Sequence, residues 1–239
     1  MQLRNKKTNK SFTIKDLSSG QQQIIYRVGY LLQNISIIKG GLVFIDEPEL
    51  SLHPDWQSTY LQFLQDLFGD DIQFVIATHS PYIVKSGINN KMVSIAKMWI
   101  AKSGMKDSKL NHTSKLGKAN FAEVNYHAFG ILTEELHIEL YLALQRKLAP
   151  EQWDGTLQKY VGGKPSDLDS VLKKAPYNIP IHVTWTDVND KKYPTKEETV
   201  MTFIRNIIHH GDDAINRGRN RTFTSQELDQ SIRKIMSFL

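Results

Sequence analysis

The feature of this sequence that most constrains its fold is an apolar run that ends abruptly in two carboxylates and a proline. Residues 42–48 read LVFIDEP and follow two glycines. A short, unbroken apolar run bounded by turn residues is typical of a strand buried in a parallel sheet. Because unpaired carboxylates are costly inside a core, we expect Asp46 and Glu47 at the carboxyl end of the strand, where parallel sheets bind ligands. Taken alone, the segment fits a metal–phosphate site and an acidic turn equally well.

Two further motifs flank this strand. Residues 17–21 read LSSGQ and open an apolar-periodic segment, and residues 74–81 read FVIATHSP, a second apolar strand that leads into His79. Residues 54–68 carry a helical apolar stripe that starts with proline, which predicts the crossover helix between the two strands. At the first motif Ser18 and Ser19 are expected to supply the side-chain oxygens that cap a helix, whose free amides could bind an anion. An ordinary helix cap would use the same residues.

In this order, the three motifs resemble the C-terminal half of an ABC-type ATPase head. By this resemblance, residues 17–21 are the signature motif, residues 42–47 the Walker B strand, residues 49–54 the D-loop and residues 77–80 the switch-histidine loop. The wording EPELSLHP followed by ATHSP resembles the soluble branch that includes RecF, SMC and OLD-like ATPases more than transporters. The resemblance covers roughly residues 10–90.

The resemblance implies an α/β fold, namely half of a parallel-sheet P-loop NTPase, with ATP and Mg²⁺ as ligands. It implies that Asp46 holds Mg²⁺ through water, that Glu47 is the general base and that His79 contacts the γ-phosphate. The expected signature contacts to the nucleotide of an opposite subunit are Ser18, Ser19, Gly20 and Gln21. The expected D-loop residues are Ser51, Leu52 and His53.

The P-loop that such a head needs does not occur in the sequence: no segment matches G-x-x-x-x-G-K-[ST]. Residues 162–164 read GGK, but Gln158 stands where the first glycine is required and Pro165 where Ser or Thr is required. We therefore expect a fold half that lacks Walker A and is completed by a homo-oligomer or by a Walker A-bearing partner chain. By itself, the chain is expected to bind ATP weakly or not at all.

Charge and composition bear on the compartment and on partners. The chain has no cysteine, so disulfides and thiolate metal sites are excluded. We find neither a signal peptide nor an apolar run of membrane-spanning length, which predicts a cytoplasmic protein without membrane contact. Residues 85–118 hold eight lysines and one acid, Asp107. Such a stretch could follow a phosphate backbone, but a solvated face is favoured because only Trp99 is interleaved with the lysines.

The composition changes near residue 119, so we expect residues 1–118 to form the ATPase half and residues 119–239 a mainly helical accessory region. Residues 92–101 are expected to form one or two strands, and residues 102–118 a polar segment. Helices are predicted over residues 126–148 and 197–210, and a third begins with a capping box at Thr224. Residues 151–194 are expected to be irregular, with one strand or extended arm over 178–187.

The predicted helix over 197–210 contains Arg205, Asn206 and His210, an RNxxxH pattern that resembles the signature of HEPN ribonucleases. On a helix Asn206 and His210 lie one turn apart, where they could stabilise a phosphorane and move a proton. The alternative is a polar helix end, at which His and Arg favour the helix dipole.

Three functions follow. The first is an ATP-hydrolysing subunit that couples nucleotide-driven dimerisation to a nuclease or DNA partner. Its helical tail most resembles ATPases of phage-defence systems such as Septu and retrons, and RecF-like repair is the closest competitor. The second is a non-catalytic interaction module derived from an ATPase. The third is a ribonuclease that uses Arg205 and His210.

Overall fold

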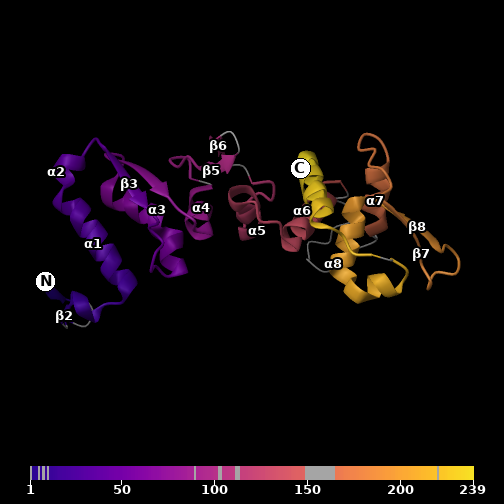
Figure 1. Ribbon diagram of the computed structural model, residues 1–239, viewed down its shortest axis with the longest axis horizontal. Coiled ribbons are helices and arrows are strands. Elements are labelled where there is room, and N and C mark those ends of the chain that lie inside the picture. The colour runs from indigo at the N-terminus through magenta and orange to yellow at the C-terminus, as the bar shows by residue number, and fades with distance from the viewer. Residues whose placement is uncertain are drawn as a thin grey trace. The chain divides into compact units, whose positions relative to one another are not determined.

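The fold is given by a computed structural model of the chain (Figure 1). The structure describes residues 2–4, 6, 9, 11–88, 90–101, 104–110, 114–148, 165–219 and 221–239. The glycine pair at 162–163 and Lys164 lie outside these residues. The chain divides into two compact units, Met1–His112 and Thr113–Leu239, which we call unit 1 and unit 2.

Unit 1 is built around two parallel strands, β3 (Leu42–Asp46) and β4 (Gln73–Ala77), joined by helix α3 (Pro54–Phe68). The predicted strand–helix–strand order is therefore confirmed. Helix α1 (Ser19–Gln33) and the short α2 (Ile35–Ile38) precede β3, and α4 (Pro81–Ile88) follows β4. An antiparallel pair, β1 (Gln2–Arg4) and β2 (Ser11–Thr13), leads through a 3₁₀ turn at Ile14–Asp16 into α1.

Only one face of the parallel pair is packed. Its inward side chains contact a core formed mainly by α3 and by residues that flank it: Leu52, Tyr60, Leu64, Phe68 and Ile72. The outward side chains alternate with these, as strand geometry requires.

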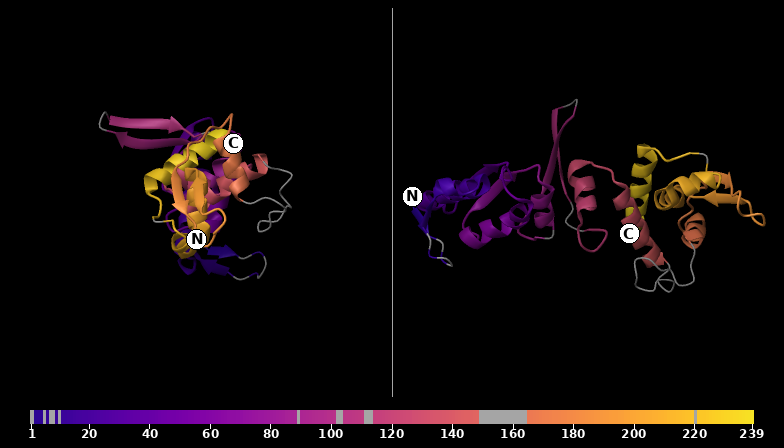
Figure 2. Two further views of the ribbon diagram at one scale, coloured as in Figure 1. Left: turned by 90° about the vertical axis from the view of Figure 1, so that its right-hand side faces the viewer. Right: turned by 90° about the horizontal axis from the view of Figure 1, so that it is seen from below.

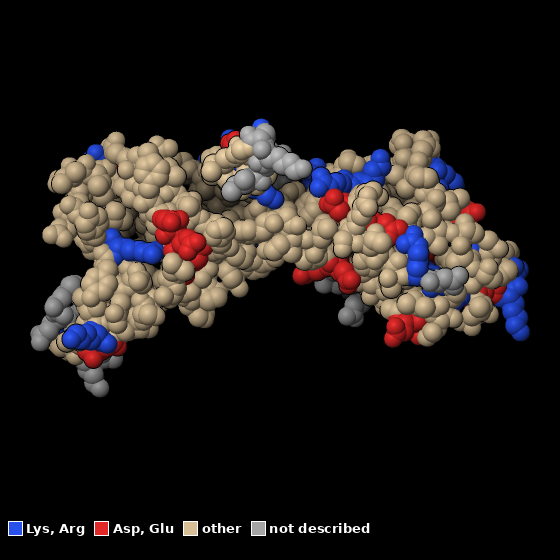
Figure 3. Space-filling model, in the orientation of Figure 1, with Lys and Arg blue, Asp and Glu red and all other residues tan. Residues whose placement is uncertain are grey.

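The outward face of the pair is exposed to solvent. Leu42 is 49%, Phe44 72% and Val75 42% exposed. The prediction of a strand buried within a sheet is therefore wrong for this face, because no described element covers it. In Figure 3, the acidic and basic side chains on the visible side of unit 1 are gathered in a few places, with uncharged surface between them.

A β-hairpin completes unit 1. Strand β5 (Ala96–Ala101) pairs antiparallel with β6 (Gly104–Lys109), and both views in Figure 2 show the two strands extending side by side. A strand within residues 92–101 is confirmed. The polar segment expected from residue 102 onward instead begins with β6, whose described side chains are all exposed.

Unit 2 packs three long helices together: α6 (Glu134–Leu148), α8 (Val200–Asn216) and α9 (Ser225–Phe238). Before them lie α5 (Phe121–Val124) and a π-helical turn at Asn125–Phe129. Between α6 and α8 lie α7 (Pro165–Lys173) and the antiparallel strands β7 (Val183–Thr186) and β8 (Thr195–Glu198). The largest fully buried side chains of unit 2 include Tyr141, Phe203, Leu136, Leu140, Leu144 and Ile232.

Two predicted helices have different bounds. The helix expected over 126–148 is interrupted, because Gly130 has a positive φ of 71° and ends the π-helical turn. Helix α6 starts afresh after Thr133, whose Oγ1 accepts a hydrogen bond from the Leu136 amide (3.2 Å). Helix α8 begins after its N-cap Thr199 and not at 197, because the preceding residue Glu198 belongs to β8.

Other details of unit 2 also refine the predictions. Gly211 has a non-helical backbone (φ 45°, ψ −124°), so the first helical segment of α8 ends there, where the predicted helix also ends, and a second segment continues across the kink to Asn216. The capping box at Thr224 is confirmed at the start of α9. The region expected to be irregular holds α7, in which Leu168 and Leu172 are buried. Within the described chain, no helix is long and apolar enough to cross a membrane.

Candidate functional site

The carboxyl ends of β3 and β4 bring the predicted catalytic residues together. The strands run in parallel with Asp46 opposite Ala77, so the residues that follow each strand emerge side by side. Glu47 comes directly after β3, and His79 lies in the loop after β4. The distance from His79 Nε2 to Glu47 Oε1 is 3.9 Å, and the histidine side chain is largely exposed. A carboxylate and an imidazole thus face one region of solvent at the edge where parallel sheets bind ligands.

The backbone of Glu47 is strained. Its φ of 40° lies in the left-handed region, which residues other than glycine rarely adopt. The Glu47 amide nonetheless donates a hydrogen bond to the carbonyl of Ala77 (2.9 Å), which fixes the turn against β4. Such backbone strain costs about 1–3 kcal/mol and is concentrated at functional sites.

Glu49 connects the two loops, a role that the sequence analysis did not assign. Its Oε1 accepts a hydrogen bond from the His79 amide (2.7 Å), and its Oε2 accepts one from the Thr78 hydroxyl (2.8 Å). The half-buried Glu49 carboxylate therefore fixes the backbone of the switch-histidine loop relative to the turn after β3. The sequence did contain a sign of this role: residues 46–49 read DEPE, so a third carboxylate follows β3, while residues 78–80 after β4 read THS.

A second connection runs from the switch loop to α3 and the D-loop. The buried Ser80 hydroxyl donates to Gln57 Oε1 (2.6 Å), and Gln57 Nε2 donates to the carbonyl of Leu52 (2.9 Å). Ser80 Oγ also accepts a hydrogen bond from the Ile83 amide (3.2 Å) at the start of α4. The loop after β4 is thereby fixed at both of its ends.

The predicted signature and D-loop segments are in contact. Gly20, in the first turn of α1, packs so closely on the D-loop that a Cβ there would lie 2.3 Å from the carbonyl oxygen of Ser51. Ser51 itself has a positive φ of 65°, and the next residue, Leu52, is buried. His53 ends the D-loop as the N-cap of α3, where its Nδ1 accepts a hydrogen bond from the Asp55 amide (3.3 Å).

The signature residues form a complete helix cap. Ser18 Oγ accepts from the Gln21 amide (3.3 Å), and Gln21 Oε1 accepts from the Ser18 amide (3.0 Å), which is a capping box. Ser19 is exposed and, among the described residues, its hydroxyl forms no hydrogen bond. The side chains of Ser18 and Gln21 thus serve the helix itself, while Ser19 remains accessible.

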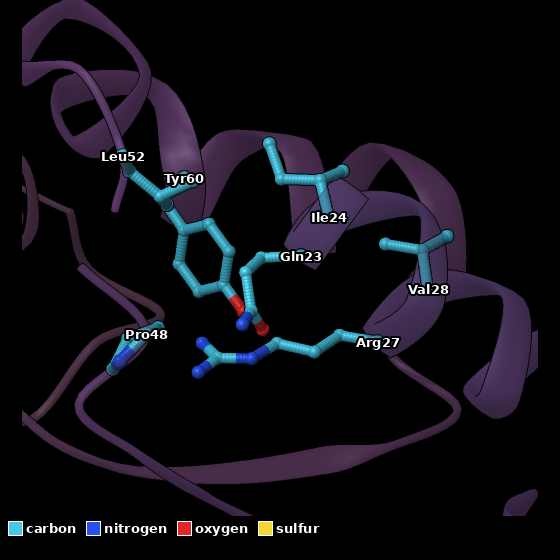
Figure 4. Close-up of a pocket in the computed structure, with 7 residues that line it drawn as sticks. All are labelled: Gln23, Ile24, Arg27, Val28, Pro48, Leu52 and Tyr60. Carbon is cyan, nitrogen blue, oxygen red and sulfur yellow. The ribbon is translucent and has the colours of Figure 1, made fainter. Parts of the chain in front are cut away.

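A small pocket lies between α1 and the D-loop (Figure 4). The Arg27 guanidinium extends toward the hydroxyl of Tyr60, and the Tyr60 side chain is buried. Burial raises the pKa of the Tyr60 hydroxyl, and the positive charge of Arg27 together with its hydrogen bond lowers it in part. The lining residues are Gln23, Ile24, Arg27, Val28, Pro48, Leu52 and Tyr60.

The carboxyl end of β3 suits Mg²⁺. The Asp46 side chain is exposed, and within the described part of the chain it forms no hydrogen bond or ion pair. The described residues hold no group of three or more metal-binding side chains. Mg²⁺ commonly binds through one or two carboxylates together with water and substrate phosphates. Asp46 therefore fits such a site when a nucleotide supplies the remaining oxygens.

The RNxxxH pattern of unit 2 lies partly in a buried polar network. Asn206 Nδ2 donates to Glu198 Oε1 (2.8 Å), and Asn206 Oδ1 accepts from Arg205 (2.9 Å). Glu198 also pairs with Arg219, whose guanidinium stacks over the Trp185 ring at 4.0 Å. Both polar atoms of the Asn206 side-chain amide are therefore engaged in hydrogen bonds, one with the buried Glu198 and one with Arg205.

The histidines beside this network are accessible. His209 and His210 are exposed just before the kink at Gly211, and their rings lie 6.5 Å apart. Partial burial and then the charge of Arg205 lower the pKa of both imidazoles. The structure therefore places Arg205 close enough to influence both histidines, while Asn206 faces Glu198.

Comparison with known proteins finds similarity to an AAA domain and to probable ATPases. Residues 3–85 match the family model described as "AAA domain, putative AbiEii toxin, Type IV TA system". The chain is 28% identical to the retron Ec83 probable ATPase of Escherichia coli over 109 residues, which are 42% of this chain and 19% of that protein. It is 34% identical to the retron Vc95 probable ATPase of Vibrio cholerae serotype O1 biovar El Tor over 87 residues, 33% of this chain and 17% of that protein.

A third relative is the Septu protein PtuA of Bacillus thuringiensis. It is 31% identical over 90 residues, which are 33% of this chain and 22% of PtuA. The predicted resemblance to AAA-family, retron and Septu ATPases is therefore confirmed. The chain spans about a fifth of the length of these relatives.

Proposed function

We propose that this chain supplies the Walker B, switch-histidine, D-loop and signature residues of an AAA-type ATPase that hydrolyses ATP to ADP and phosphate. The observation that carries the proposal is the pairing of Glu47 and His79 at the carboxyl ends of two parallel strands, 3.9 Å apart. The match to the AAA-domain family model lies in this same unit, at residues 3–85, and it supports the proposal together with the similarity to retron and Septu ATPases.

Each side chain has a distinct role in this proposal. Asp46 would hold Mg²⁺, which would supply positive charge to neutralise the phosphates. Glu47 accepts the proton of the attacking water, for which its exposed carboxylate is suitably placed. His79 donates a hydrogen bond toward the γ-phosphate, and Glu49 positions His79 through its backbone. Ser19 at the start of α1 is available to a nucleotide held by an opposite subunit.

The P-loop half comes from another polypeptide segment or from a partner chain. The outward face of β3 and β4 supports this part of the proposal, because parallel sheets are normally covered on both faces. The exposed Leu42, Phe44 and Val75 form the surface that the Walker A-bearing part would cover. Hydrolysis would then couple to a nuclease or DNA partner within a phage-defence system, as the similarity to the retron ATPases and the Septu protein supports.

The test is ATP hydrolysis by the chain mixed with the polypeptide that its upstream gene encodes, with wild type compared with Glu47→Gln. Activity should require both chains and should fall at least about 100-fold in Glu47→Gln, since a general base contributes about 10²–10⁴-fold. Asp70→Asn, which alters an exposed carboxylate before β4, is the matched control and should keep activity. Hydrolysis that is indifferent to Glu47 would overturn the assignment.

A phage-plating assay tests the biological setting. Cells that express the complete system should resist phage, and Glu47→Gln should abolish that resistance while the protein remains at its normal level. Protection that persists in Glu47→Gln would separate defence from hydrolysis.

A further inference from the structure

The β5–β6 hairpin has two chemically different faces. In its antiparallel register Trp99 lies opposite Lys106, and Lys97 lies opposite Ser108. Cross-strand partners point to the same face of a sheet, and so do residues two apart along a strand. Lys97, Trp99, Lys106 and Ser108 therefore share one face, which we call the tryptophan face.

The opposite face carries different side chains. Met98 pairs with Asp107, and Ala96 pairs with Lys109. The only acid between residues 85 and 118, Asp107, thus lies on the side away from Trp99. The charged side chains of the tryptophan face, Lys97 and Lys106, are therefore both basic.

The tryptophan face is accessible and its charges are not neutralised. The Trp99 side chain is 43% exposed and every described side chain of β6 is exposed. Across the described residues, neither Lys97 nor Lys106 pairs with a carboxylate. Trp99 is thus held beside Lys97 and Lys106 by the register of a two-stranded arm, and Figure 2 shows the backbone of this arm.

We infer that the tryptophan face of the β5–β6 hairpin binds single-stranded nucleic acid, with a base stacked on Trp99 and neighbouring phosphates on Lys97 and Lys106. Stacking of unpaired bases on aromatic rings beside a basic track is the general means by which proteins bind single strands without sequence preference. A duplex keeps its bases stacked on one another and would leave Trp99 without a partner. The face also lacks Arg, Asn and Gln, the side chains that most often read base edges in a groove.

This inference deepens the proposed function, because it names the nucleic-acid contact of the ATPase. It is tested without ATP or Mg²⁺, so its failure is distinguishable from failure of the hydrolysis proposal. The proposed chemistry is common to DNA and RNA, and the experiment compares the two.

The experiment measures fluorescence anisotropy of labelled oligothymidylate and oligouridylate of roughly 20 nucleotides, longer than a typical site of about 4–16. The full chain should bind both at low salt. Trp99→Ala should weaken binding by about 5- to 150-fold, the range for loss of one stacked base, whereas Trp99→Phe should retain most of the affinity. If Trp99→Ala binds the oligonucleotide more weakly while Trp99→Phe keeps its affinity, the loss of affinity is not caused by misfolding.

Two lysines of the same strand provide the matched comparison. Lys106→Ala should lower affinity and reduce the slope of log K against log salt by about 0.7, as for one lost phosphate contact to a single strand. Lys109→Ala removes the same charge from the opposite face and should have a clearly smaller effect. Equal effects of the two variants, or no effect of Trp99→Ala, would overturn the inference.

A membrane surface is the alternative that the assay must separate. Vesicles that contain phosphatidylserine are incubated with the chain and sedimented. Vesicle binding that depends on Met98 and Met105, together with no binding to either oligonucleotide, would assign the hairpin to lipid and overturn the inference.

Discussion

The carboxylate of Glu49 accepts a hydrogen bond from the backbone amide of His79 at 2.7 Å, so the loop after β3 positions the loop after β4. The same carboxylate accepts a hydrogen bond from the hydroxyl of Thr78, with 2.8 Å between Oγ1 and Oε2. Thr78 and His79 lie 29 and 30 positions after Glu49 in the sequence, and the Glu49 carboxylate hydrogen-bonds to both of them. Glu49 is therefore a positioning residue, distinct from the proposed general base Glu47.

Replacing this carboxylate should loosen the switch-histidine loop. Glu49→Ala is expected to lower the free energy of unfolding by about 1–3 kcal/mol, since hydrogen bonds to a charged acceptor are lost. Amide hydrogen exchange at His79 should accelerate. Thermal unfolding and exchange measured on the same sample check both effects. Glu49→Gln retains one acceptor and should give an intermediate result. If the exposed Asp70→Ala matched Glu49→Ala in both measurements, the positioning role would be excluded.

Two glycines of α1 should respond in opposite directions to alanine. Gly20→Ala would bring a Cβ against the Ser51 carbonyl and should destabilise the chain by about 1–3 kcal/mol, a typical value for overpacking. Gly29 lies in the same helix, and apart from its chain neighbours and the helix's own backbone nothing lies within 4 Å of the position that a Cβ would take there, so Gly29→Ala should stabilise by up to about 1 kcal/mol through helix propensity. Chemical denaturation of both variants measures the difference. Similar stabilities would mean that the close contact between α1 and the D-loop is absent in solution.

Stability of the chain should fall as the pH drops below about 6.5 because of His137. Burial lowers the pKa of this imidazole from 6.5 to about 3, and its Nε2 lies 2.9 Å from the hydroxyl of Ser231. The unfolded chain therefore binds a proton over this interval while the folded chain does not. The contribution of His137 to the free energy of unfolding is fully present above pH 6.5. It decreases by about 1.4 kcal/mol per pH unit as the pH falls toward 3.

The variant His137→Gln isolates this contribution. Glutamine can still hydrogen-bond to Ser231 but does not titrate. Denaturation at several pH values from 7 to 5 should show a shallower pH dependence in the variant than in wild type. Parallel curves would show that His137 does not account for the acid sensitivity.

Asn206 should prove structural. Asn206→Asp would remove the amide donor to Glu198 and place a second carboxylate beside it, which we expect to cost about 1–3 kcal/mol of stability. His210→Ala changes an exposed side chain and should stay within about 0.5 kcal/mol of wild type. Thermal unfolding compares the two. An RNA-cleavage assay on the same proteins would revive the ribonuclease alternative if Asn206→Asp folded normally and lost activity.

The parts of the fold that depend on local sequence could be predicted. The strand before Asp46, the proline-initiated helix α3 and the capping box at Thr224 each follow from residues that lie within a few positions of one another. The parallel direction of the two strands also follows, because a helical crossover between neighbouring strands of one sheet returns the chain to the same edge.

Features that depend on distant partners could not be predicted. Helix α8 starts late because Glu198 pairs in β8 and then binds Arg219, which lies beyond the end of the helix. The role of Glu49 was missed because its hydrogen-bond partners, Thr78 and His79, lie in the loop after β4. Phe44 looks like a core residue in sequence, yet it is 72% exposed, because no described element covers this face of the strand.

The uncovered face of β3 and β4 has a consequence for the order of assembly. Burying a large apolar side chain stabilises a complex by about 1.5–3 kcal/mol, so Leu42, Phe44 and Val75 favour the covering polypeptide whether or not nucleotide is bound. The two halves of the proposed site would therefore meet before ATP arrives. In that order, ATP acts on a complex that already exists, and its role is to change the state of that complex.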